Sequence, residues 1–163
     1  MNVVLLEPEI HYNTGNIGRT CVATGSRLHL IGPLGFSLDD RHIRRAGLDY
    51  WRDLKLSRYD GYDEFLSKNP GANIIMATTK GGAAYTNIRY APDCFIMFGK
   101  ESAGIPERIL KTDTASCVRI PMLPGTRSLN LANSVAVILY EALRQNGFAD
   151  LLQTSGVLKT DGE

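Results

Sequence analysis

The sequence is poor in the features that mark secreted and membrane-spanning proteins. Only three of its 163 residues are cysteine, Cys21, Cys94 and Cys117, and no pair has the CxxC spacing of a zinc or redox motif. The longest apolar runs, such as Val135 to Leu139, are too short to cross a bilayer. No charged start leads into the apolar segment of a secretory signal. These absences predict a cytoplasmic protein with no membrane partner and with cysteines that are small buried side chains.

An excess of one charge sign is missing as well. The 18 Lys and Arg residues balance 17 Asp and Glu residues, and the net charge is +1. This balance excludes a scaffold that binds nucleic acid through net charge alone, but it leaves room for a local basic face. The three histidines, His11, His29 and His42, lie far apart and lack the HExxH spacing. We therefore expect no metal site.

Short apolar runs alternate with helical patterns along the chain. The apolar runs predict strands over residues 2–7, 27–31, 53–59, 73–78, 93–98 and 116–120, and the helical patterns predict helices over 16–24, 41–46, 62–68, 106–110 and 130–145. This alternation is typical of a single α/β domain with a mainly parallel sheet flanked by helices. Ligands of such sheets bind at the carboxyl ends of the strands, so the loops there are candidate sites.

Three strand-end loops carry glycines and polar side chains. The first, residues 8–19, holds two glycines and brings Arg19 into the start of a helix. A helix N-terminus at this place could bind a phosphate. The plainer alternative is a connecting loop in which Asn13 or Asn16 caps the helix. The pattern of this loop alone leaves both interpretations open.

The second loop, residues 98–106, contains Gly99 followed by a lysine, as a nucleotide-binding loop does. The Walker pattern fails twice, because Cys94 stands where its first glycine belongs and Glu101 replaces the Ser or Thr that holds magnesium. What remains is a glycine next to a strand end, where the backbone can approach a ligand closely.

The third loop, residues 119–130, joins a buried strand to the longest helix. Two prolines stiffen it, and Ser128 and Asn130 can cap the helix that follows. The chain shows no Ser-His-Asp order, no paired catalytic carboxylates and no Cys-His nucleophile. The residue types alone therefore indicate an α/β binding fold with three glycine-bearing loops.

Taken together, the three loops are far more specific than any one of them. Their order and spacing resemble the three motifs of the SpoU branch of the SPOUT RNA methyltransferases, which read here as Asn13-x5-Arg19, Phe98-Gly99-x-Glu101-x2-Gly104-Ile105-Pro106 and Ile120-Pro121-Met122-x5-Ser128-Leu129-Asn130. The resemblance covers about residues 1–146. The stretches 7–16 and 44–50 further resemble the compact TrmL (YibK-like) subfamily, the tRNA wobble-nucleotide 2′-O-methyltransferases.

The resemblance implies a fold and a cofactor. In the SPOUT fold, the segment from about residue 74 to residue 145 forms a deep trefoil knot, which general rules of chain topology disfavour. S-adenosylmethionine would bind in this knot without a metal ion. The implied cofactor-binding residues are Ala77, Thr78, Gly99, Glu101, Ile120, Met122, Ser128 and Leu129.

The resemblance also implies catalytic residues and a dimer. The implied catalytic residues are Asn13, Arg19, Ser128 and Asn130, and Arg19 of one chain completes the site of the other in a homodimer. The counterpart of Arg19 is proposed as the base that accepts the hydroxyl proton, although a guanidinium is normally never deprotonated in proteins. The rival hypothesis is that Arg19 binds a nucleotide phosphate and thereby fixes the ribose.

The implied partner is the anticodon stem-loop of tRNA. Arg41, Arg44 and Arg45 fall at i, i+3 and i+4 of a predicted helix, and we predict that this basic face contacts RNA. Interleaved acidic residues leave a salt-bridged, solvated surface as the alternative. Tyr50 and Trp51 could stack on an unpaired base.

We expect one methyltransferase domain over residues 1–153 and a flexible tail over residues 154–163. The predicted reaction is S-adenosylmethionine-dependent 2′-O-methylation of the ribose at the wobble nucleotide, either cytidine or a modified uridine. The alternatives are the same fold acting on ribosomal RNA or at another tRNA position, and a non-catalytic RNA-binding module. A Rossmann-type oxidoreductase is a third alternative, and the missing GxGxxG weighs against it.

Overall fold

A computed structural model of the chain describes residues 1–38 and 49–155. They form a seven-stranded sheet with the strand order β3-β2-β1-β6-β4-β7-β5, and all of its paired strands run parallel. The strands are β1 (Asn2–Leu6), β2 (Arg27–Ile31), β3 (Lys55–Tyr59), β4 (Ile74–Ala77), β5 (Ala83–Ala84), β6 (Phe95–Phe98) and β7 (Cys117–Arg119). The predicted α/β class with a mainly parallel sheet is confirmed. The predicted helix over residues 41–46, with Arg41, Arg44 and Arg45, lies outside the described residues.

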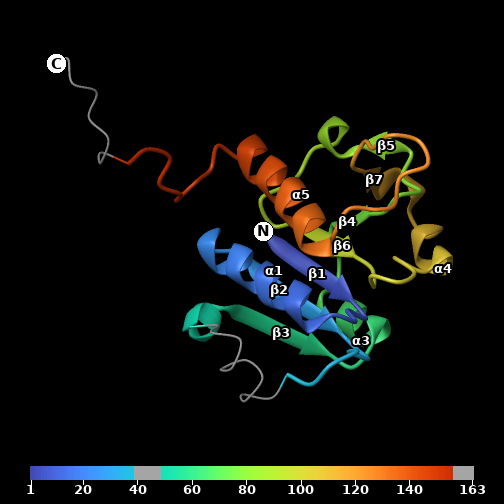
Figure 1. The fold of residues 1–163 in the computed structure, drawn as a ribbon, viewed down its shortest axis with the longest axis horizontal. Helices are drawn as coiled ribbons and strands as arrows, with labels where there is room; N and C mark the ends of the chain where they lie inside the picture. Colours follow the sequence, from blue (N-terminus) through green and yellow to red (C-terminus); the bar gives the residue numbers. More distant parts are fainter. Residues whose placement is uncertain (39–48, 156–163) are drawn as a thin grey trace.

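Helices cover both faces of this sheet (Figure 1). The helices α1 and α5 pack side by side on one face, and α3 and α4 lie on the other face. The described helices are α1 (His11–Ala23), α3 (Tyr62–Lys68), α4 (Glu107–Leu110) and α5 (Leu131–Gln145), with the short 3-10 helices η1 (Asp49–Asp53), η2 (Tyr85–Asn87) and η3 (Thr114–Ser116). Among the described residues, no helix has the length and apolar character needed to span a membrane.

Strand β1 lies inside the sheet and contributes to a hydrophobic core on each face. Successive side chains of a strand point to opposite faces. Val3 and Leu5 accordingly pack in the core under α1 and α5, whereas Val4 and Leu6 pack in the core under α3 and α4. All four side chains are buried. Burial on both faces explains why this strand is an uninterrupted apolar run in the sequence.

The first helix begins five residues earlier than the pattern predicted, at His11 instead of residue 16. Most of the expected first loop is therefore helical, and the helix is capped by Ile10 without a side-chain hydrogen bond, so neither Asn13 nor Asn16 is the cap. The two glycines that suggested a loop lie inside the helix, and η1 packs closely against Gly18. A Cβ atom on Gly18 would lie 3.2 Å from a ring carbon of Trp51.

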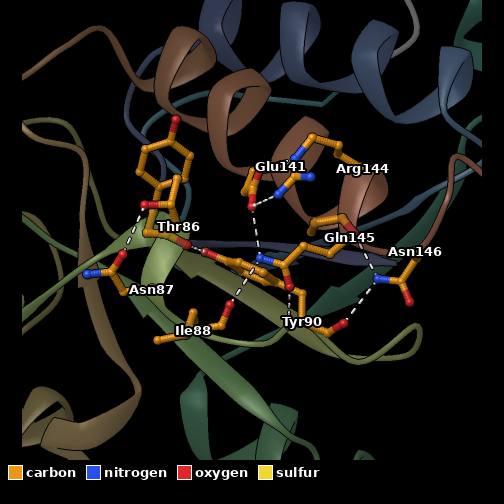
Figure 2. Close-up of polar contacts among 10 residues, drawn as sticks. Thr86, Asn87, Ile88, Tyr90, Glu141, Arg144, Gln145 and Asn146 are labelled. Carbon is orange, nitrogen blue, oxygen red and sulfur yellow. Dashed lines mark hydrogen bonds and ion pairs between the residues drawn. The ribbon is translucent and has the colours of Figure 1, made fainter.

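The last helix matches its predicted bounds, and polar contacts hold both of its ends. Asn130 is the N-cap, and its side-chain oxygen accepts hydrogen bonds from the backbone N–H groups of residues 132 and 133 at 2.9 and 3.4 Å. Ser128 makes no such cap, so that alternative is wrong. Figure 2 shows the other end, where Gln145 donates to the Ile88 carbonyl at 3.0 Å and accepts from the Tyr90 N–H at 3.1 Å.

Strand β5 and the three short 3-10 helices were not predicted from the sequence. Strand β5 is a pair of alanines, which carry no strand signal. Strand β3 begins at residue 55 because residues 49–53 form η1. The predicted knot concerns how residues 74–145 thread through one another. The strand order alone does not decide this threading, so the knot stays a prediction.

The sheet also buries several polar and sulfur-bearing side chains. Cys21, Cys94 and Cys117 are buried free thiols, as predicted. His29 is 3% exposed and its ring nitrogens lie 2.9 Å from the Tyr59 hydroxyl and 3.2 Å from the side-chain oxygen of Asn2. Burial, assisted by a neighbouring arginine, lowers the pKa of this imidazole to about 4. The histidine is therefore a neutral core residue at physiological pH.

Candidate functional site

A cavity of about 510 Å³ lies over the carboxyl ends of β4, β6 and β7. Its walls are residues 77–80 after β4, residues 98–105 at the end of β6, and residues between 118 and 131 that lead from β7 into α5. Ile10 and Asn13, from the start of α1, complete it. A volume of this size is typical of small-molecule and cofactor sites. The cavity therefore lies where a parallel sheet is expected to bind its ligand.

The three loops that were singled out in the sequence meet in this cavity. Ten of the predicted site residues line it, namely Asn13, Ala77, Thr78, Gly99, Glu101, Ile120, Met122, Ser128, Leu129 and Asn130. Every residue of the predicted cofactor set is among them. Residues far apart in the sequence are thus brought together around one space, while their individual roles stay predictions.

The backbone around Gly99 shows why the second loop needs a glycine at this position. A Cβ atom there would lie 2.0 Å from the carbonyl carbon of Gly104 and 2.2 Å from the nitrogen of Ile105, so any side chain would collide with backbone. Gly104 itself has a φ of 72°, in the left-handed region that favours glycine. Its N–H donates to the Lys100 carbonyl at 2.8 Å. The two glycines fold residues 99–104 into a tight turn whose backbone forms the wall of the cavity.

A chain of side-chain hydrogen bonds joins the three loops. The amide nitrogen of Asn13 donates to Glu101 Oε1 at 2.9 Å, and the side-chain oxygen of Asn13 accepts from the amide of Asn130 at 3.0 Å. Asn13 is 6% exposed. Because Asn130 also caps α5, the chain runs from the second loop, through the first, to the start of the last helix. Both polar atoms of the Asn13 side chain are used, so its orientation is set.

A second set of contacts holds the start of the first loop against the second. The other oxygen of Glu101, Oε2, accepts from the Glu9 N–H at 2.8 Å. The Glu9 carboxylate in turn accepts from the backbone N–H and the hydroxyl of Ser102, each at 2.8 Å, and these bonds lower the pKa of Glu9. Lys100 and Glu7 form an ion pair at 2.9 Å.

These contacts add Glu9 to the site, a residue that was not predicted, and they indicate a different role for Glu101. The only sequence signal for Glu9 was its place in the stretch at residues 7–16. The predicted cofactor residue Glu101 lines the cavity, yet both of its oxygens are engaged by the first loop. Its contact with the cofactor stays a prediction, and the observed hydrogen bonds give it a positioning role.

Arg19 is the one predicted catalytic residue that the fold does not bring to the cavity. It is exposed on α1, and its guanidinium carbon lies 5.0 Å from the centroid of the Tyr50 ring. The Tyr50 hydroxyl donates to the Gly15 carbonyl at 2.7 Å, and Trp51 packs on Gly18. The two aromatic rings that were candidates for base stacking are therefore engaged with α1 of their own chain.

The cavity offers backbone groups, amides and hydroxyls on apolar walls, and its charged side chains, Lys80, Lys100 and Glu101, are each engaged by a partner. Burial raises the pKa of Cys21 to about 12 and that of Cys94 to about 11, so neither thiol is a nucleophile. Over residues 1–38 and 49–155, no cluster of three His, Cys, Asp or Glu side chains is placed to hold a metal ion. Such a cavity is suited to binding and orienting an organic cofactor.

The fold and the site define an α/β protein whose ligand cavity is built from three loops at the ends of parallel strands. Comparison with known proteins identifies the family within this class. The chain belongs to the SpoU rRNA methylase family, whose model matches residues 1–140. The family resemblance seen in the three motifs is thereby confirmed.

Named relatives match almost the whole chain. A protein of Listeria monocytogenes is 51% identical over 155 residues, which are 93% of this chain and 92% of that protein. The tRNA (cytidine(34)-2′-O)-methyltransferase of Escherichia coli is 46% identical over 149 residues, which are 91% of this chain and 95% of that protein.

Solved structures agree with the fold. A structure described as giving insight into the 2-OH methylation of C/U34 on tRNA has a TM-score of 0.84 and 42% identity, and the match covers 90% of this chain and 95% of that one. The SpoU methyltransferase AviRb of Streptomyces viridochromogenes, solved with the cofactor AdoMet, has a TM-score of 0.74 and 25% identity over 90% of this chain and 57% of that one. The predicted class of fold, with its sheet flanked by helices, is therefore that of the SpoU methyltransferases.

Proposed function

We propose that this chain transfers the methyl group of S-adenosylmethionine to the ribose 2′-oxygen of the tRNA wobble nucleotide, cytidine or a modified uridine. The observation that carries this proposal is the meeting of all three motif loops around one cavity of cofactor size. The relatives that carry this activity in their names match this chain over more than nine-tenths of their own length. The RNA partner is then the anticodon stem-loop.

The residues present fit S-adenosylmethionine. Ile120 and Leu129 offer apolar wall to an adenine ring, and the backbone turn at Gly99 leaves N–H and C=O groups free of side-chain cover for a ribose. The cofactor supplies a methyl group that is already activated by a positively charged sulfur. The cofactor set Ala77, Thr78, Gly99, Glu101, Ile120, Met122, Ser128 and Leu129 is part of this proposal.

The protein then has to align the 2′-oxygen with the methyl group and to accept a proton. Alignment alone supplies several kcal/mol towards the barrier, on the order of 7–11 kcal/mol in well-oriented reactions. Asn13 and Asn130 are held rigidly by their mutual hydrogen bond. Ser128 lies beside them on the cavity wall with an exposed side chain. We assign these three residues to orienting the ribose.

The exposed faces of α1 and α5 support a homodimer. Both helices have exposed residues at a helical spacing, and the helices pack side by side, so their exposed faces adjoin. These residues are Tyr12, Asn16 and Arg19 on α1 and Asn133, Val137 and Tyr140 on α5. Tyr12 is 68% exposed and Tyr140 is 46% exposed, so each helix presents a large side chain that a second copy of the chain would cover. Arg19 lies in this face, where it faces a second copy and not its own cavity.

Co-expressed variants test whether Arg19 acts on the partner's cavity. A chain with Arg19→Ala and a chain with Asn130→Ala should each be inactive as homodimers. If Arg19 acts across the interface, the mixed dimer has one intact site, and a statistical mixture regains about a quarter of wild-type activity. A mixture that stays inactive would place Arg19 in its own chain's site. Sedimentation of each variant confirms that dimers form.

The role of Arg19 is tested separately by Arg19→Lys. Retained tRNA affinity with a nearly complete loss of turnover fits a base or a strictly geometric role. A loss confined to affinity contradicts the base and fits the phosphate contact, because lysine keeps the charge but not the planar fork of donors.

The proposed reaction is tested with purified protein, tritiated S-adenosylmethionine and bulk tRNA from a strain that lacks the endogenous activity. Digestion of the labelled RNA should give a 2′-O-methylated cytidine or uridine derivative from the wobble position. Absence of label on tRNA, with normal cofactor binding, would overturn the tRNA assignment and point to ribosomal RNA. Asn87→Asp, an exposed change on η2, serves as a variant expected to keep full activity.

We also propose that the folded unit spans residues 1–153 and works in the cytoplasm. Leu151 still packs on the core, whereas Leu152 is 89% exposed, which supports a boundary near this point. Three free thiols suit a reducing compartment, which is also where tRNA is modified.

A further inference from the structure

A second cavity adjoins the first at the edge of the sheet. It has a volume of about 670 Å³, and its walls are β5 and the loop of residues 121–126. Thr79, Met122 and Ser128 line both cavities, so the two spaces are contiguous. Figure 1 shows this loop beside β5 and β7, at the opposite edge of the sheet from β3. Of the predicted cofactor set, only Met122 and Ser128 reach the second cavity.

The second cavity has a cation without a counter-charge. Arg119 lies in its wall and is half-buried, and Arg127 is exposed on the loop that leads from the cavity to α5. Within the described part of the chain, neither guanidinium has a hydrogen-bond or ion-pair partner. Lys80 and Lys100, which also line the cofactor cavity, are both paired with glutamates. An unpaired, partly buried guanidinium is planar and can donate two parallel hydrogen bonds to an oxyanion such as a phosphate.

The same loop presents apolar surface at the mouth of the cavity. Leu123 is 78% exposed, and a proline precedes and follows it at positions 121 and 124. Gly125 has a φ of 77° and turns the chain back, so the loop has a defined tip. Exposed apolar side chains beside a cationic wall match the two faces of a nucleotide, which are an apolar base and a charged phosphate.

We propose that the second cavity binds a nucleotide adjacent to the methylated one, with its backbone phosphate on Arg119 and Arg127 and its base against Leu123. This inference rests on the proposed function, and it names where the RNA lies on this chain. Because the two cavities share a wall at Ser128, a nucleotide in the second places a neighbouring ribose at the mouth of the first. The cavity thus sets which ribose of the loop reaches the methyl group.

The cofactor's own carboxylate is the other oxyanion that Arg119 could bind. RNA is the better candidate for the second cavity, because the first cavity already contains the whole predicted cofactor set. The second cavity shares only three wall residues with the first. The test must therefore read RNA affinity and cofactor affinity separately.

The test uses the variants Arg119→Gln and Arg127→Gln, singly and together, with Arg89→Gln as the matched control. Arg89 is exposed and has no partner among the described residues, and it lies beside Ile88 and Tyr90, which contact the C-terminal end of α5. Arg89 lines neither cavity. The probes are an unmodified anticodon stem-loop RNA, measured over a range of salt concentrations, and S-adenosylmethionine, measured by calorimetry.

Each site variant should weaken RNA binding by roughly 10-fold, the effect of one charge-assisted hydrogen bond. The slope of log affinity against log salt should decrease by roughly 0.7 for each lost contact. Cofactor affinity should stay unchanged, and Arg89→Gln should behave as wild type. A fall in cofactor affinity with unchanged RNA binding would assign the cavity to the cofactor and overturn the proposal. Variants indistinguishable from Arg89→Gln would also overturn it. Failure of the proposed function is recognised independently, because the wild type then labels no tRNA.

Discussion

An aspartate at position 13 tests how the three loops of the site are held together. In the wild type, the Asn13 amide donates to Glu101 and its oxygen accepts from Asn130. The Asn13→Asp substitution keeps the shape and the acceptor, but it replaces the donor by a second carboxylate oxygen that faces Glu101. Because Asn13 is 6% exposed, water screens this repulsion poorly.

The size of the effect follows from the geometry. Two unit charges about 4 Å apart repel by about 4 kcal/mol at an effective dielectric constant of about 20. We therefore expect the free energy of unfolding to fall by about 4 kcal/mol at pH 8, which is a large share of the 5–15 kcal/mol typical of a domain. The repulsion raises the pKa of the new carboxyl pair in the folded state above its value in the unfolded state. The variant is therefore destabilised in full above the raised pKa, and it regains stability as the pH falls through that pKa.

Urea unfolding at pH 8 and at pH 5, at one protein concentration, measures this effect. The control is Asn87→Asp, the same chemical change at an exposed position. Asn13→Asp should unfold at a much lower urea concentration than the control at pH 8 and recover part of the difference at pH 5. If the two variants unfold alike at pH 8, the hydrogen bond between Asn13 and Glu101 does not hold the loops and the reasoning is refuted.

Two further predictions concern the fold around the site. Gln145→Leu leaves the Tyr90 N–H and the Ile88 carbonyl without their partner (Figure 2), so urea unfolding should show a loss of about 3 kcal/mol. The control is Lys68→Gln, which removes an ion pair whose side chains are 59% and 34% exposed and should unfold close to wild type; equal losses would contradict the structure. The pKa of His29 is lowered to about 4, so the free energy of unfolding should fall by up to about 3 kcal/mol as the pH drops from about 6.5 to 4. An NMR titration that returns an ordinary pKa for His29 would refute this.

The predicted bounds of helices agree best with the structure where the hydrophobic pattern is long or where helix-ending residues flank it. Helix α5 has an apolar face at Val135, Ile138 and Leu139, and it lies within one residue of its predicted bounds. Helix α3 occupies its predicted residues, 62–68. The start of α1 was predicted wrongly because Gly15 and Gly18 indicate a loop on local grounds. Their place in the helix depends on η1, which packs on them from 30 residues away or more.

The sequence indicated which residues belong to the candidate site, but it did not indicate the contacts that they make with one another. Motif spacing accounts for eight of the ten predicted residues that line the cavity, because each motif lies at the end of a strand and the strands are parallel. The other two, Ala77 and Thr78, were implied by the family resemblance alone. The same spacing gave no indication that Glu101 is bound by Asn13 and by the backbone of Glu9. It also gave no indication of the second cavity, whose wall includes the unpredicted strand β5.

Local pattern was sufficient for the class of fold and the order of its main elements, and the spacing of the three motifs carried the family resemblance that implied the residues around the cofactor cavity. These properties depend on hydrophobic period and on the spacing of residues within one loop, which any stretch of sequence displays. The tertiary structure alone decided that Asn13 joins Glu101 and Asn130, across 88 and 117 residues of chain, and that Arg19 lies on an exposed face away from its own cavity. Contacts of this kind depend on which strands become neighbours in the sheet, and no local pattern encodes that pairing.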